Sequence, residues 1–154
     1  MLMIGENAAH YFAERVMVGN PFADMVSAEP LAASAAIAAI RKGYPARILK
    51  DTSRFFSVPD ARIQAIARVP ASTASRLEKV NAKIDSGASE RIYRMGTVAR
   101  MAIHIFEDET AALAWMRQPN HALGDAAPLD LMDTEPGAVA VRQVLSAIAS
   151  GGVA

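Results

Sequence analysis

The 154-residue sequence contains no cysteine, which excludes disulfide bonds and thiolate metal sites. A chain without disulfides suits a reducing compartment, so we expect a cytoplasmic protein. No segment is long and apolar enough to span a bilayer, and the opening "MLMIGENAAHYFAERV" is too polar for a signal peptide. We therefore expect a globular protein, with 52% hydrophobic residues, that does not enter a membrane.

Recognisable catalytic motifs are also missing. The sequence has no glycine-rich phosphate loop, no nucleophile elbow and no paired-carboxylate motif. Its histidines lie far apart, and none has a second ligand at helical spacing. Asp130 and Asp133 fit better as solvated or capping residues of a tight turn than as an acid–base pair. We predict that the protein is not an enzyme and needs neither a metal nor a cofactor.

The formal net charge is zero, but the charges are segregated along the chain. Residues 41–100 contain thirteen basic and five acidic residues, a net charge of +8, whereas residues 101–154 contain two and seven, a net charge of −5. A basic middle beside an acidic end indicates two surfaces with different partners, the basic one being a candidate for a polyanion. An ordinary solvated basic face is the alternative.

Apolar residues recur at intervals of three and four, and β-branched residues never gather in alternating runs, so we predict an all-α fold. The segment 1–27 is interpreted as an N-terminal arm or an extra helix, and 28–88 and 89–154 as two helical domains. One helix is expected to have Pro30 in its first turn, and a second to span about 45–55. Ser57 and Ser72 are the expected caps of two more, and a long helix should run from Ser89 to about 106. Further helices are expected after Asp108, from Pro128 as a short turn, and after Asp133 or Thr134.

The segment 57–80 has the pattern of a helix-turn-helix: two short helices separated by the break at Val69-Pro70, the second polar and basic. Leu77 is the expected buried residue of the second helix. The candidate DNA-binding residues are Ser72, Thr73, Ser75, Arg76 and Lys79, with Arg62, Arg68 and Lys83 as further phosphate-binding charges. The pattern is a weak signal by itself, since many short helical pairs share it.

The C-terminal segment combines tightly spaced turns with an amphipathic helix in which Val141, Val144, Leu145 and Ile148 form one inward stripe. The helix stops at Gly151-Gly152, which predicts a flexible tail of Val153 and Ala154. Such a helix is first of all a core helix, and such a tail is often simple fraying. The residues alone leave that interpretation open beside a functional one.

The same segment resembles the Xre/MbcA/ParS antitoxins. The residue types and spacing that carry the resemblance are Trp115, Pro119-Asn120, Leu123-Gly124, Pro128-Leu129-Asp130-Leu131, Thr134-Glu135, Gly137, Val141, Leu145 and Gly151. Upstream, "SERIYRM" (89–95) is similar to the family's long helix and "ARVPASTASRL" to its helix-turn-helix, so the resemblance covers about 43–154.

The resemblance implies an antitoxin that binds and neutralises a RES-domain toxin, an enzyme that consumes NAD+ or transfers its ADP-ribose. It also implies a homodimer that represses its own operon, alone or with the toxin. The toxin-binding residues implied by the family are Asn120, Arg142, Leu145, Ser146, Ser150, Gly151, Gly152, Val153 and Ala154. The last four would enter the NAD+ cleft, where the terminal carboxylate or Arg142 would pair with a charged group. The alternative is a stand-alone helix-turn-helix regulator that uses its C-terminal half to dimerise.

Overall fold

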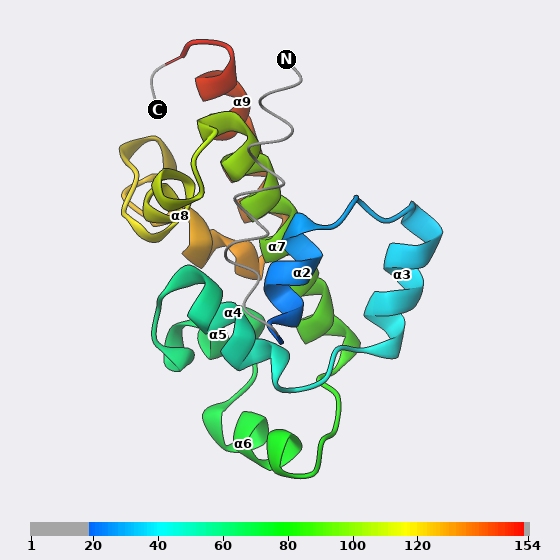
Figure 1. The fold of residues 1–154 in the computed structure, drawn as a ribbon. Helices are drawn as coiled ribbons and strands as arrows, with labels where there is room; N and C mark the ends of the chain where they lie inside the picture. Colours follow the sequence, from blue (N-terminus) through cyan, green and yellow to red (C-terminus); the bar gives the residue numbers. More distant parts are fainter. Residues whose placement is uncertain (1–18, 153–154) are drawn as a thin grey trace.

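The computed structural model describes residues 19–152, and all regular elements in that range are helical (Figure 1). Two isolated bridges, Pro45 with Lys83 and Asn120 with Ala126, are the extended pairings of the described chain. The predicted all-α fold is confirmed. The elements are α2 (Pro21–Ser27), α3 (Ala33–Lys42), α4 (Ile48–Phe56), α5 (Asp60–Ala67), α6 (Ala71–Lys79), α7 (Ser86–Phe106), α8 (Glu109–Arg117), η1 (His121–Leu123), η2 (Pro128–Asp133) and α9 (Glu135–Ala149).

Helix α7 is the centre of the molecule. It has 21 residues, about 32 Å of helix, and begins after the N-cap Asp85, whose carboxylate accepts the Ala88 N–H at 2.7 Å. Helices α2, α3 and α5 pack against it, and so do α8, η2 and α9. Its buried side chains therefore belong to one continuous core that includes residues from both halves of the chain: Ala88, Ile92, Met95, Val98, Ala99, Ala102 and Ile103.

The N-terminal segment interpreted as an arm or an extra helix contains helix α2 at Pro21–Ser27. Asn20 caps it, accepting the Ala23 N–H at 3.0 Å. Phe22 is fully buried, with its ring centroid 5.1 Å from that of Phe55 and 5.5 Å from that of Phe56. This part of the segment is thus packed on the body, whereas residues 1–18 lie outside the described residues.

Several predicted helix boundaries were right and several were wrong. Asp108 caps α8 as predicted, and Thr134 rather than Asp133 caps α9, accepting the Gly137 N–H at 3.1 Å. Pro30 lies before α3, which begins at Ala33. Ser57 is the left-handed C-cap of α4, with φ +56°, instead of the N-cap of the next helix. Ser72 lies within α6, because that helix begins one residue earlier.

Candidate functional site

Helices α5 and α6 form the predicted pair, with α6 at one end of the molecule (Figure 1). The turn between them depends on Arg68, whose φ of +59° takes the left-handed conformation that glycine adopts at lower cost. Val69 is buried and anchors the turn. The buried residue of α6 is Ala74, while Leu77 is half-buried, so the prediction for Leu77 was wrong.

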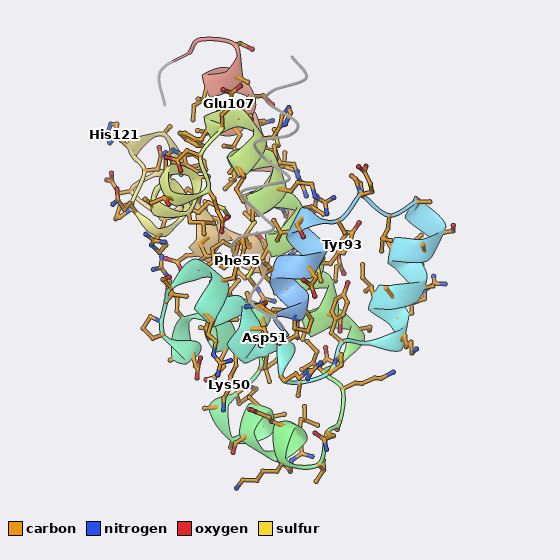
Figure 2. The ribbon with its side chains drawn as sticks, viewed as in Figure 1. Lys50, Asp51, Phe55, Tyr93, Glu107 and His121 are labelled. Atoms are coloured by element: carbon orange, nitrogen blue, oxygen red, sulfur yellow. The ribbon has the colours of Figure 1, made fainter. Side chains whose placement is uncertain are left out.

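Most of the predicted DNA-binding residues lie on the exposed surface of α6. Thr73 is half-buried, and the exposed ones are Ser72, Ser75, Arg76 and Lys79. One ion pair helps to hold the helix, from Lys50 Nζ on α4 to Glu78 Oε1 at 3.1 Å. Figure 2 shows Lys50 and Asp51 on the part of α4 nearest α6. A cavity of about 100 Å³ lies between α4, α5 and α6.

Asp51 is a buried carboxylate beside this site, 6% exposed, and its Oδ2 has no hydrogen-bond partner among the described residues. Burial raises the pKa of Asp51, and the positive charges of Arg47 and Arg54 offset part of that rise. The neighbouring hydroxyl of Ser53 donates to the Asp60 carboxylate. Asp51 is thus enclosed in the helical body, whereas Asp60 is exposed at the start of α5.

Two of the predicted phosphate-binding arginines are engaged within the protein. Arg62 donates to both carboxylate oxygens of Asp130, at 2.8 and 3.1 Å, in a bidentate pair. Arg68 donates to Asp133 Oδ2 at 3.3 Å. The basic middle and the acidic end of the sequence thus meet through these pairs, which link α5 to η2. Part of the positive charge counted in the sequence is therefore paired with carboxylates of the same chain.

Arginines of the "SERIYRM" segment fasten the junction between η2 and α9. Arg94, which is 8% exposed, donates to the Met132 carbonyl at 2.8 Å and to Glu135 Oε2 at 3.1 Å. Arg91 donates to the Asp133 carbonyl at 3.2 Å. Hydrogen bonds from a buried guanidinium fix carbonyls that would otherwise lose their water partners. The start of α9 is therefore held in one position by α7.

Close packing at the same junction requires a glycine. An added Cβ at Gly137 would lie 2.1 Å from the Leu131 carbonyl oxygen, far inside van der Waals contact. The helix then buries Ala138, Val141 and Leu145 against the core. The opposite side of α9 is exposed and includes Val139 and residues at i+4, i+7 and i+11: Gln143, Ser146 and Ser150.

The end of α9 is an ordered helix stop. Gly151, at φ +83°, donates its N–H to the Ile148 carbonyl at 3.0 Å, and Gly152 donates to the Ala147 carbonyl at 2.6 Å, which together make a Schellman motif. An added Cβ at Gly152 would lie 2.7 Å from the Ala147 carbonyl oxygen. Gly151 and Gly152 are thus hydrogen-bonded to the last turn of α9, and the chain has no hinge between α9 and residue 152.

The other predicted toxin-binding residues differ in their surroundings. Arg142 is half-buried and donates to Glu135 Oε1 at 3.1 Å. Leu145 is fully buried and Asn120 is 9% exposed, its side chain accepting the Ala122 N–H at 2.9 Å. Both side chains therefore contribute to the packing of the C-terminal half of the chain. Val153 and Ala154 lie outside the described residues.

Sequence reasoning missed Val139 and Gln143 on the outward side of α9. Val139 is 41% exposed, a large apolar side chain on the surface. The signal was present in the sequence, because positions 139, 143, 146 and 150 repeat at helical spacing opposite the buried stripe. The pairs of Arg62 with Asp130 and of Arg68 with Asp133 were also missed. Their members are separated by 68 and 65 positions along the chain, and no local pattern links residues so far apart.

Other kinds of site find no support between residues 19 and 152. That range contains no group of three or more histidine, aspartate or glutamate residues placed to hold a metal ion. His121 is fully exposed and points outward from the loop after α8 (Figure 2), with Nδ1 3.4 Å from Asp125 Oδ1. No helix in the described range combines the length and hydropathy that crossing a bilayer requires.

Comparison with known proteins agrees with this geometry. Residues 35–95 match the antitoxin Xre-like helix-turn-helix domain, and residues 101–151 match the antitoxin Xre/MbcA/ParS C-terminal toxin-binding domain. A protein named Antitoxin Xre from Yersinia enterocolitica is 27% identical over 113 residues, 73% of this chain and 76% of the relative. Another Antitoxin Xre, from Photorhabdus laumondii, is 29% identical over 115 residues, 74% of this chain and 78% of the relative.

These matches place the chain in a class of proteins with a helix-turn-helix domain followed by a helical toxin-binding domain. The structure has the same order, with α5 and α6 before η2 and α9. The chain belongs to the Xre/MbcA/ParS family of antitoxins. Its partner on the C-terminal side is therefore a toxin.

Proposed function

We propose that the chain neutralises a RES-domain, NAD+-consuming toxin by binding, without catalysis of its own, and that it covers the toxin's active site with α9 and residues 150–154. The observation that carries the proposal is the way α9 is presented. Its inner face is locked to the core through Val141 and Leu145, its start is fixed by Arg94, and its outer face and capped end are exposed. A rigid, pre-formed helix loses little conformational entropy on binding.

A RES-domain toxin is favoured by the residue pattern of the C-terminal segment, from Trp115 to Gly151, which keeps the spacing of antitoxins that act on such enzymes. The exposed line on α9 has one apolar residue, Val139, among small polar ones. This composition suits a helix that docks into a cleft of another protein through an apolar anchor with hydrogen-bonding neighbours. The same complex, or the antitoxin as a homodimer, would repress its operon through α6.

The test is to purify the antitoxin and a RES-domain enzyme encoded beside its gene, and to measure binding and NAD+ loss. We expect the antitoxin to form a complex with the enzyme and to stop NAD+ loss once it is in molar excess. Val139→Asp should weaken binding at least about tenfold, because it places an unpaired charge in the contact. Val80→Asp is the matched control, an exposed valine at the far end of α6, and should leave toxin binding unchanged.

Two truncations separate the helix stop from the residues after it. Removing residues 153 and 154 leaves the Schellman motif intact, whereas removing residues 151–154 deletes it. If the tail enters the active site, the shorter truncation already restores NAD+ loss in the presence of the antitoxin. If only the capped end of α9 is needed, the longer truncation alone does so. Full neutralisation by both truncated chains would contradict active-site occlusion by this end.

A further inference from the structure

The basic residues between positions 41 and 100 separate into two groups according to their contacts. Six bind carboxylates or backbone carbonyls inside the protein: Lys50, Arg62, Arg68, Arg91, Arg94 and Arg100. The remaining seven make no side-chain hydrogen bond or ion pair within the described part of the chain: Arg41, Lys42, Arg47, Arg54, Arg76, Lys79 and Lys83. This second group is called the free group below, and two of its members, Arg47 and Arg54, interact with the charge of the buried Asp51.

Three members of the free group lie beside the pairing of two distant segments, residues 44–46 and residues 82–84. The Ala46 N–H donates to the Ala82 carbonyl at 2.9 Å, and the Ile84 N–H donates to the Tyr44 carbonyl at 2.9 Å. An added Cβ at Gly43 would lie 3.5 Å from the Lys83 Cβ and 2.6 Å from the Ile84 carbonyl oxygen, so the backbones touch there. Lys42, Arg47 and Lys83 flank this pairing, are all exposed, and are called the basic edge below.

The basic edge continues directly from the C-terminal end of α6. The Ala82 N–H donates to the Leu77 carbonyl at 2.8 Å, which folds the chain after α6 back onto its last turn. That chain then rises beside the connection between α3 and α4 (Figure 1). The basic edge thus lies next to the C-terminal end of α6, the helix that carries the exposed Arg76 and Lys79.

Acidic side chains are few beside this surface. Asp51 is buried and interacts with the charges of Arg47 and Arg54, Asp60 accepts from Ser53, Glu78 pairs with Lys50, and the exposed Asp85 caps α7. Exposed cations in excess over nearby anions attract polyanions and bind phosphate oxygens without reading sequence. A helix-turn-helix places its second helix in the major groove, so charges beside that helix come next to the sugar–phosphate backbone.

We propose that the basic edge is a second contact surface for duplex DNA, which binds backbone phosphates beside the groove that α6 occupies. The inference rests on the proposed DNA-binding function of α6 and adds the part of the surface that supplies affinity without sequence preference. Arg62 and Arg68 are excluded from this surface because Asp130 and Asp133 hold them.

The experiment measures binding of the full chain to two fluorescein-labelled duplexes, one from the region upstream of its own gene and one with that sequence scrambled, between 50 and 200 mM salt, roughly the range over which phosphate contacts are resolved. The test variant carries Lys42→Gln, Arg47→Gln and Lys83→Gln together. We expect the salt slope to fall by about 3 and affinity to fall by about eightfold per lost contact at 0.1 M salt, for both duplexes alike. The matched control carries Arg62→Gln and Arg68→Gln and should keep the wild-type slope.

The possible failures are distinguishable. If the wild type shows no salt-dependent DNA binding, the proposed function of α6 is wrong. If the wild type binds and Arg76→Ala weakens binding, but the triple variant binds as the wild type does, the basic edge is not a DNA surface and this inference is overturned. A triple variant that keeps DNA binding but loses toxin binding would also overturn it and assign the surface to the toxin. Thermal melts of all variants check that each of them is folded, since substitutions of exposed side chains change stability little.

Discussion

Gly137 gives the sharpest test of how α9 is mounted on the body. A Cβ added there would lie 2.1 Å from the Leu131 carbonyl oxygen, whereas ordinary contact begins near 3.4 Å. In Gly137→Ala the first turn of α9 must therefore move from η2 by about 1 Å, and such overpacking costs about 1–3 kcal/mol. The better helix propensity of alanine returns about 0.5–1 kcal/mol of that.

We expect Gly137→Ala to lower the free energy of unfolding by about 1–2 kcal/mol, a fall in Tm of roughly 2–8 °C for a chain of this size. Urea denaturation followed by circular dichroism measures the change, and toxin affinity should fall with it because α9 is displaced. Gly87→Ala is the control, since an added Cβ there comes no closer than 3.3 Å to its neighbours. A Gly137→Ala chain as stable as the wild type would refute the close approach of α9 and η2.

Two further substitutions test features of the helix-turn-helix half. Ser57→Gly should raise the free energy of unfolding by about 1 kcal/mol in urea denaturation, because φ at Ser57 is +56°; a loss of stability would instead favour Ser57 as a helix N-cap. Burial raises the pKa of Asp51, so the folded state holds its proton to higher pH than the unfolded state and loses stability as pH rises through that pKa. Asp51→Asn should therefore gain stability relative to wild type between about pH 3 and pH 7, and a constant difference across that range would contradict the raised pKa.

The parts of the fold that were predictable from sequence are those set by local patterns. Helical spacing predicted Val141 and Leu145 of the α9 stripe correctly, whereas Val144 and Ile148 of that stripe are only half-buried. The caps Asp108 and Thr134 follow from a short polar residue before a helix. Ser57 and Ser72 have the same chemistry, yet they do not cap. Each serine stands close to a proline, and proline at positions 59 and 70 supplies the extended N-cap conformation instead.

The parts that were not predictable depend on contacts between distant residues. Arg62 and Arg68 lie in a basic, helix-turn-helix-like stretch, and only the folded chain shows that Asp130 and Asp133 reach them. The glycine pair at the end of α9 was unpredictable for a local reason. The sequence Gly151-Gly152 is equally compatible with a hinge and with a Schellman motif. The backbone hydrogen bonds to Ala147 and Ile148 decide between the two.

A single long helix, α7, contributes its inward side chains to the packing of both halves. The two halves of the chain are therefore coupled in the fold, because a foreign C-terminal half would also have to match Arg62 and Arg68 with its own acids. If α9 contacts the toxin as we propose, new toxin preferences would arise by changing its outward positions, such as Val139 and Gln143. Such surface changes would leave the core around α7 unaltered.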